Sequence, residues 1–333
     1  MFSTSEPPAL DASLLSLQPW AMQLIFAADA DAFGSGRRSL SQQCRAGELI
    51  RLRPGVYVRT EDWQQTPAWE RERTRIRAVS EQVPGCRVLI QQSAAAIWGL
   101  PVIGPTPSVL LLGSPASHGR CRGGLRWTQR ALLEPVETFD GMLLTSRAQT
   151  VLDMAAHLDF EHAVPAMDQV LRVDRARGLP PLSKELLRDL TLKLPFRTKQ
   201  AKARRVVDFA DPRSESPGES YSRAVLHRFG FPAPELQHEF STPEGRFRSD
   251  FYWKDQLLVG EFDGAVKYGV KGSALPPSWE TLTQEKRRED AIRASGVRIV
   301  RWSWTDIRRP SEHPESLVRR LVAAGLPRSG RLH

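Results

Sequence analysis

The alternation of hydrophobic and polar positions divides the chain into three segments, the first of which ends near residue 66. A short basic helix is predicted after the Gly-Ser turn at 34–36. It is followed at 48–59 by a period-2 pattern, which is typical of a two-stranded ribbon, with its turn at Pro54-Gly55. A helix followed by such a ribbon predicts a winged helix-turn-helix DNA-binding domain in residues 1–66.

Six arginines lie on this predicted helix and ribbon. They are Arg37, Arg38 and Arg45 on the helix, and Arg51, Arg53 and Arg59 on the ribbon. Guanidinium groups at such positions suit contacts with phosphate and with a DNA groove, so these six are candidate nucleic-acid-binding residues. A small α+β subdomain with solvated arginines is the alternative interpretation of the same pattern.

The second segment, residues 67–210, is predicted to form a mixed α/β domain. Helical periodicity is found at 69–83, twice within 143–172, at 183–194 and at 197–210. A strand and a small-residue helix are predicted at 88–104, and a short buried strand at 108–113. Thr145 or Ser146 is the expected N-cap of a helix. No residues in this segment have catalytic spacing.

The third segment, residues 211–333, begins with a linker rich in Pro, Ser and acidic residues. The pattern then predicts helix, strand, strand, helix, strand and helix, in the ranges 217–231, 246–253, 256–263, 281–296, 297–304 and 314–326. A turn near Lys254-Asp255 would join the first two strands into a hairpin. The whole chain is therefore predicted to be an α+β multidomain protein.

Two carboxylates meet on one face of that predicted hairpin. Asp250 and Glu261 fall on facing positions if the two strands pair antiparallel, and Asp263 shares the face of Glu261. Close carboxylates repel each other unless a cation joins them. Hard oxygen ligands that leave positions open for water suit Mg²⁺ or Mn²⁺, so the spacing predicts a metal site.

Such an ion would lower the pKa of a bound water and neutralise charge developing on a phosphodiester. Lys267 and Lys286 are the candidates for orienting that water. In the alternative interpretation, Asp250 and Glu261 only pair with Arg246, Arg248 or the charged run at 285–290.

Composition and charge narrow the class of protein. The chain has 333 residues, 41% hydrophobic and 26% charged, which is typical of a soluble globular protein. It has no apolar stretch of 18 residues and no signal-peptide pattern, so a cytoplasmic protein with no membrane partner is expected. The net charge of +9 favours a polyanionic partner, with nucleic acid first. The three widely spaced cysteines are expected to be free thiols.

The third segment resembles the PD-(D/E)xK nuclease superfamily, and more closely its very-short-patch-repair-like endonuclease domains. The motifs "RSDF", "GEFDG" and "GVRIVRW" after a helix that carries Glu219 give this resemblance. It implies an α–β–β–β–α–β core with a divalent-metal site, in which Glu219 supports the metal shell and Asp250 and Glu261 are ligands. Asp263 occupies the usual lysine position, so Lys267 is expected to supply the missing amine.

The first two segments resemble AbiEi-type antitoxins of type IV toxin–antitoxin systems. The phrases "GELIRLRPGVYV", "SAAAIWGLP" and "LLTSRAQTVLDMA" give this resemblance. It implies an operator-binding winged helix followed by a second, antitoxin-like domain. DNA, a second copy of the chain and a cognate toxin are the partners expected.

Two main hypotheses follow. In the first, a winged helix targets a Mg²⁺- or Mn²⁺-dependent endonuclease domain to DNA for defence or repair. In the second, the protein is a non-catalytic transcriptional regulator of the antitoxin type with a degenerate nuclease fold. A third, an interaction protein whose positive charge is only solvated surface, is the least specific.

Overall fold

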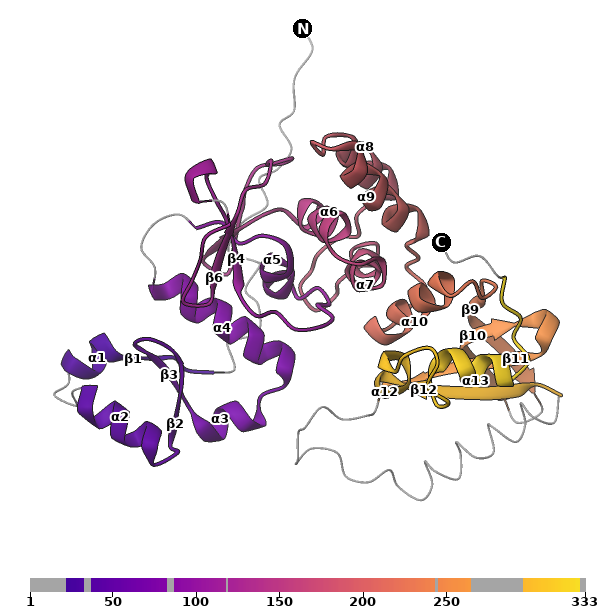
Figure 1. Ribbon diagram of the computed structural model, residues 1–333, viewed down its shortest axis with the longest axis horizontal. Coiled ribbons are helices and arrows are strands. Elements are labelled where there is room, and N and C mark those ends of the chain that lie inside the picture. The colour runs from indigo at the N-terminus through magenta and orange to yellow at the C-terminus, as the bar shows by residue number, and fades with distance from the viewer. Residues whose placement is uncertain are drawn as a thin grey trace, which may run out of the picture.

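The computed structural model describes residues 22–32, 37–82, 87–117, 119–242, 245–264 and 296–329. Helices and several small sheets alternate along the chain, which confirms the α+β class (Figure 1). No helix in these ranges is both long and apolar enough to cross a membrane.

The N-terminal part is built around a small sheet. Its elements are β1 (Ile25–Phe26), α1 (Ala27–Ala32), α2 (Arg37–Arg45), β2 (Leu49–Arg53), β3 (Val56–Arg59) and α3 (Thr60–Gln65). The strands pair antiparallel in the order β1-β3-β2, and Gly55 provides the positive φ of 79° that the β2–β3 turn needs. Val56, Val58 and Trp63 form its core together with Ala78 of the next helix. The predicted helix and ribbon are both present.

The middle part holds the largest hydrophobic core. Its elements are α4 (Ala68–Gln82), α5 (Gln91–Trp98), β4 (Val109–Leu112), β5 (Cys121–Arg122), β6 (Leu125–Thr128), β7 (Glu137–Phe139), β8 (Met142–Leu144), α6 (Arg147–His157), α7 (Phe160–Val170), α8 (Lys184–Leu192) and α9 (Arg197–Phe209). Ser146 caps α6, because its hydroxyl accepts a hydrogen bond from the Gln149 backbone N–H at 3.1 Å. The strand predicted before α5 is reduced to isolated bridges at Leu89.

The C-terminal part is a four-stranded sheet with helices packed against it. Its elements are α10 (Pro217–Arg228), β9 (Glu235–Thr242), β10 (Gly245–Trp253), β11 (Leu258–Asp263), β12 (Arg298–Ser303), α12 (Trp304–Arg308) and α13 (Leu317–Ala323). The strand order is β12-β11-β10-β9, with β9, β10 and β11 antiparallel and β11 and β12 parallel. The predicted hairpin is therefore present, as strands β10 and β11.

Two details of this part differ from the prediction. β9 was not predicted, because Leu236 and Phe240 are its only apolar residues and two such positions do not mark a strand. Within it Gln237 has a left-handed φ of +55°. Leu257 was assigned to a strand, but it has a left-handed φ of 45° at the end of the turn, and β11 begins one residue later. The helix predicted at 281–296 falls almost entirely outside the described residues.

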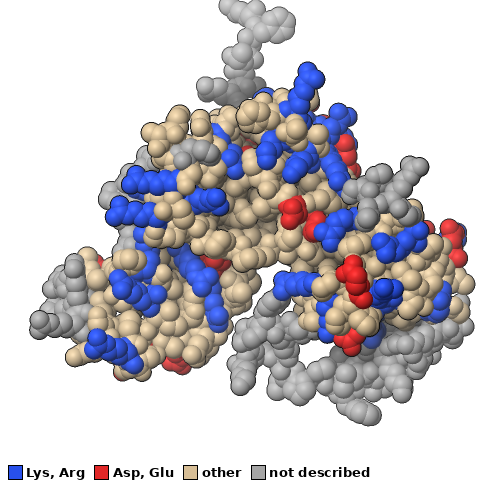
Figure 2. All heavy atoms as spheres, in the orientation of Figure 1, with Lys and Arg blue, Asp and Glu red and all other residues tan. Residues whose placement is uncertain are grey.

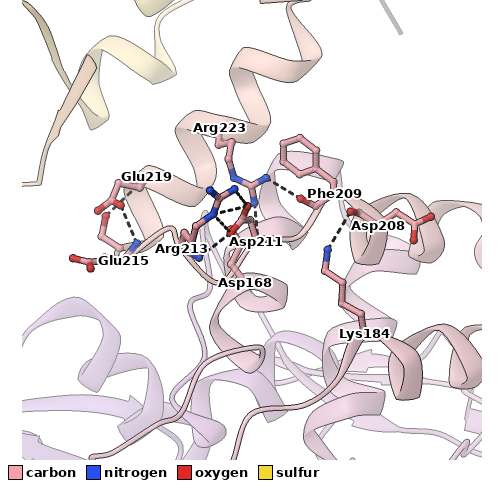
Figure 3. Close-up of polar contacts among 10 residues, drawn as sticks. Asp168, Lys184, Asp208, Phe209, Asp211, Arg213, Glu215, Glu219 and Arg223 are labelled. Carbon is pink, nitrogen blue, oxygen red and sulfur yellow. Dashed lines mark hydrogen bonds and ion pairs between the residues drawn. The ribbon is translucent and has the colours of Figure 1, made fainter. Parts of the chain in front are cut away.

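The middle and C-terminal parts are joined by helix packing between α7 and α10 (Figure 1). Asp168 on α7 is fully buried, and its carboxylate accepts two hydrogen bonds from Arg223 Nη2 on α10, at 2.8 and 2.9 Å. Arg223 also donates to the Phe209 carbonyl, and its guanidinium stacks over that ring (Figure 3). A buried pair with this many partners fixes how α10 lies on the middle part.

Candidate functional site

The wing arginines differ in their exposure. Arg51 and Arg59 are exposed on β2 and β3, and Arg45 is exposed in the last turn of α2. Arg51 Nε makes a long hydrogen bond, 3.4 Å, to the Arg53 carbonyl beside a bulge in the ribbon. Arg37 and Arg38 lie in the first turn of α2, and their side chains are outside the description. The structure thus places three of the six predicted cations on solvent-facing positions of one helix and one ribbon.

Arg53 is set apart from its neighbours because it is half-buried. Burial, and then the charge of Arg87 in the middle part, lower the pKa of its guanidinium. Within the described residues its Nε and Nη1 atoms have no hydrogen-bond partner. A buried guanidinium N–H without an acceptor is costly. Arg53 therefore differs from Arg51 and Arg59 in lying close to the middle part rather than in solvent.

An open groove of about 810 Å³ runs beside the wing. It is lined by α1, α2 and the ribbon turn, with Arg51, Tyr57 and Pro54 on one side and Ser41 on the other. Asp29 and Glu81 also line it. Basic side chains stand out over the winged-helix and middle parts in Figure 2, whereas the larger acidic patches lie toward the C-terminal part.

The predicted carboxylate pair is formed by the β10–β11 hairpin. Phe251 pairs with Gly260 and Tyr252 with Val259, which places Asp250 beside Glu261. Asp250 Oδ2 accepts a hydrogen bond of 2.9 Å from the Phe262 backbone N–H. Glu261 Oε2 accepts one of 2.9 Å from Arg301 Nε on β12. Both carboxylates are half-buried, and Asp263 is exposed at the end of the strand.

Glu219 lies in the first turn of α10, at the start of the same part. Its Oε2 atom accepts a hydrogen bond from the Glu215 backbone N–H at 2.8 Å (Figure 3). The same atom accepts another from Gln237 Nε2 at 2.9 Å. In the β9–β10 register Ser249 pairs with His238 and Phe251 with Leu236, so Gln237 lies opposite Asp250. Gln237 therefore links the helix glutamate to the strand that carries Asp250.

The predicted metal site is assembled in part. In the ranges that the structure describes, no group of three or more His, Cys, Asp or Glu side chains is arranged to hold a metal ion. Asp250 and Glu261 are hard oxygen donors on one hairpin, and Mg²⁺ often uses one or two protein carboxylates with water and phosphate. Arg301 would compete with a cation for Glu261. Lys267 and Lys286 lie outside the described residues, so their roles stay predictions.

Three residues of this region were missed by sequence reasoning. Arg301 is the parallel-strand partner of Glu261, and the pairing that brings them together crosses more than thirty residues of chain. Gln237 carries no sequence signal for its left-handed conformation. Glu215 was assigned to a linker, yet its carboxylate holds Arg248 Nη2 at 2.6 Å. Arg248, one of the cations considered as a partner for the hairpin carboxylates, thus also pairs with Glu215.

Two large pKa shifts lie in the helical core of the middle part, away from both sites. Burial raises the pKa of Asp153 to about 7, although the nearby Arg130 opposes the shift. Burial lowers the pKa of His157 to about 4, against the effect of its hydrogen bond to the Asp153 carbonyl. These groups are packed in the helical core, so we assign them to folding stability.

Comparison with known proteins supports the N-terminal resemblance. Residues 14–60 match the family model described as "Transcriptional regulator, AbiEi antitoxin". Two Mycobacterium tuberculosis proteins, "Uncharacterized protein MT2308" of strain CDC 1551 / Oshkosh and "Uncharacterized protein Rv2248" of strain H37Rv, are each 27% identical over 274 residues. The match covers 82% of this chain and 92% of each relative.

Among the solved structures that match is the crystal structure of the RV2827C protein from Mycobacterium tuberculosis. It has a TM-score of 0.36 and 14% identity, and the match covers 66% of this chain and 84% of that one. The nuclease resemblance of the C-terminal part stays a prediction. The resemblance to AbiEi antitoxins is confirmed for residues 14–60, which match that family model, and its extension over the middle part stays a prediction.

Proposed function

We propose that this protein is a DNA-binding transcriptional regulator of the antitoxin type. The observation that carries the proposal is the β2–β3 ribbon beside α2, within a stretch that matches the AbiEi antitoxin model. Arg45, Arg51 and Arg59 are exposed on these elements and suit phosphate contacts. Duplex DNA is the first proposed partner, and a cognate toxin and a second copy of the chain are the others.

The test is the salt dependence of duplex binding by the full chain. Each phosphate contact contributes about 0.9 to the slope of log affinity against log salt. The double variant R51A/R59A is expected to reduce that slope by about 1.8. The matched control is R188A/R319A, which removes two exposed arginines from α8 and α13. Equal slopes for parent and R51A/R59A would overturn the proposal.

As a second candidate function we propose metal-dependent hydrolysis of phosphodiester bonds by the C-terminal part. The specific observation in its favour is the hairpin that sets Asp250 beside Glu261, after a helix that bears Glu219. The described order, α10, β9, β10, β11 and then β12, is compatible with the α–β–β–β–α–β core that the nuclease resemblance implies.

In this proposal Asp250 and Glu261 hold Mg²⁺ or Mn²⁺, which would activate water and neutralise charge on the phosphodiester. The Phe262 N–H orients Asp250, and Gln237 holds Glu219 in the same region. Asp263 lies at the exposed strand end, where it would assist. Lys267 would orient the attacking water.

Plasmid cleavage with Mg²⁺ or Mn²⁺ tests this second candidate. D250N and E261Q are each expected to abolish cleavage, whereas D255N, at an exposed position in the β10–β11 turn, is expected to retain it. Absence of cleavage by the parent, together with no Mn²⁺ binding by calorimetry, would rule the candidate out and leave the regulator proposal intact.

A further inference from the structure

A second basic groove lies where the middle and C-terminal parts meet. It is open to solvent, has a volume of about 610 Å³, and draws its lining from three separate stretches of chain. The lining residues are Arg172, Arg175, Pro212, Arg213, Glu215 and Gln237. Arg172 and Arg175 follow α7, Arg213 and Glu215 precede α10, and Gln237 is in β9. None of these residues belongs to the winged-helix part.

The groove has a surplus of positive charge. Arg175 is exposed, and within the described residues no ion pair or hydrogen bond engages it. Arg172 donates to Gln169 through one terminal nitrogen, but its buried Nε has no partner there. The acidic side chain of the lining, Glu215, is already paired with Arg248 at 2.6 Å. The charge left over therefore comes from Arg172 and Arg175.

Arg213 contributes less, because Asp211 already neutralises it. Its Nη2 lies 2.7 Å from Asp211 Oδ2, and its Nε reaches both oxygens of that carboxylate (Figure 3). The pair fixes the linker as one wall of the groove. Arg172 and Arg175 come from a different stretch of chain and are not neutralised by a carboxylate of the lining, so they are the residues whose removal separates recognition from wall structure.

The groove reaches β9, the strand next to the one that carries Asp250. Gln237 belongs to the groove lining, and it also donates to Glu219 Oε2 at 2.9 Å. Its cross-strand position is opposite Asp250, and neighbouring strands are separated by about 5 Å. Gln237 holds a left-handed φ of +55°, a conformation that costs free energy in a non-glycine residue and that clusters at functional sites. A ligand lying in the groove therefore reaches the strand of Asp250.

We propose that this groove binds the phosphodiester backbone of a nucleic-acid strand and leads it to Asp250 and Glu261. The inference rests on the second candidate function. Guanidinium groups bind phosphate through two parallel hydrogen bonds, which suits Arg172 and Arg175. An open groove with cations along one wall fits a polymer that passes through. Asp250, one strand beyond the lining residue Gln237, is where a scissile phosphate and a cation would meet.

The test measures single-strand binding by the full chain in EDTA, where no metal-dependent cleavage takes place. The wing is neutralised first with R51A/R59A, so that remaining affinity comes from other surfaces. A fluorescent oligonucleotide of about 20 nucleotides is titrated at several salt concentrations. Each phosphate contact to a single strand contributes about 0.7 to the salt slope. Adding R172A/R175A is expected to reduce the slope by about 1.4.

The matched control adds R188A/R319A to the same background, which removes two charges outside the groove. This control is expected to leave the slope unchanged. An equal loss in the groove variant and the control, or no loss in either, overturns the inference. Competition by polyglutamate as effective as that by unlabelled oligonucleotide of equal charge also overturns it, because the groove would then respond to charge alone.

Failure of the nuclease candidate gives a different result. Cleavage by the parent with Mn²⁺ is measured independently of binding in EDTA. If the parent cleaves and R172A/R175A binds and cleaves as the parent does, the groove inference is overturned and the nuclease candidate stands. If the parent never cleaves but R172A/R175A lowers the salt slope of binding by about 1.4, the nuclease candidate is rejected and the groove remains a strand-binding surface.

Discussion

In the winged-helix part, Arg51 and Arg59 extend into solvent from a three-stranded sheet, whereas in the C-terminal part the carboxylates are held by protein hydrogen bonds. Asp250 is fixed by a backbone N–H and Glu261 by Arg301. Cations that meet a DNA backbone act over several ångströms and tolerate mobile side chains. Carboxylates that share a metal need a geometry fixed within tenths of an ångström.

The two parts also differ in how they are attached to the middle part. The C-terminal part is fastened through the buried Asp168–Arg223 pair and the packing of α7 on α10. The winged-helix core is small and shares Ala78 of α4. The comparison teaches that the candidate carboxylates depend on a buried ion pair between two parts of the molecule, whereas the candidate DNA contacts stand on a core of apolar contacts.

The largest effect is expected from breaking that interface. D168A leaves the Arg223 guanidinium buried without its carboxylate, and such losses cost about 3–5 kcal/mol. Urea unfolding followed by tryptophan fluorescence should show this destabilisation. Duplex binding by D168A through the wing should persist at urea concentrations at which the winged-helix part is still folded. R213A, which removes the exposed partner of Asp211, is the control and should cost less than about 1 kcal/mol. Similar losses in both variants would contradict the comparison.

Next in size is the pH dependence of the middle part, which supports both regions. The pKa of buried Asp153 is raised to about 7, so the fold prefers the protonated carboxyl. The unfolded chain ionises near 3.9, so stability present below that pH is lost as the pH rises toward 7, by up to about 4 kcal/mol. D153N should therefore be more stable than the parent at pH 8 and not at pH 4. D189N, on the exposed face of α8, should change neither value.

His157 acts in the opposite direction over an overlapping range. Its pKa is lowered to about 4, so the folded protein keeps the ring neutral, and stability is lost as the pH falls from about 6.5 toward 4. In the parent the two groups partly cancel between pH 4 and 6.5. D153N should reveal the His157 effect as a rise in stability across that range. A flat profile in D153N would contradict the assignment.

A smaller effect is expected from crowding the carboxylate hairpin. A methyl group added at Gly218, in the first turn of α10, would overlap the Phe262 ring. Phe262 carries the N–H that holds Asp250, so G218A should shift that contact and destabilise the C-terminal part by about 1–3 kcal/mol. The control is G264A, whose added carbon would lie 3.6 Å from Phe262 Cε1, an ordinary contact. Equal unfolding midpoints for the two variants would show that Phe262 moves freely.

The smallest effect concerns Arg301. Its pair with Glu261 is partly exposed, so R301A should change stability by less than about 1 kcal/mol. If Glu261 holds a cation, removing this competitor should tighten Mn²⁺ binding several-fold by calorimetry. The control is R188A, which breaks the exposed Arg188–Asp208 pair outside the hairpin and should leave the Mn²⁺ affinity unaltered. Weaker Mn²⁺ binding in R301A would assign Arg301 a supporting role.

Much of the local structure could be predicted from the sequence. The ribbon turn at Pro54-Gly55, the cap at Ser146 and the hairpin that bears Asp250 and Glu261 all depend on residues close together in the chain. Hydrophobic periodicity and turn residues report such short-range preferences well. The candidate carboxylates were found for the same reason, since one hairpin contains both.

Elements with short or irregular strands could not be predicted. β5 to β8 have two to four residues each, too few for an alternating pattern to stand out. β9 is longer, but Leu236 and Phe240 are its only apolar residues, too few to mark an alternating strand. The groove at Arg172 and Arg175 was also missed, because its lining comes from three stretches that are separate in sequence.

The sequence by itself determined the α+β class, the basic ribbon and the two carboxylates on one hairpin, because local periodicity and turn chemistry specify these features. Only the tertiary structure decided which partner each charged group received. Glu261 pairs with Arg301 through a parallel strand, Glu219 with Gln237, and Asp168 with Arg223 across two parts of the molecule. Such pairs form when distant elements pack together, and the free energy of burial selects them rather than any preference of the local chain.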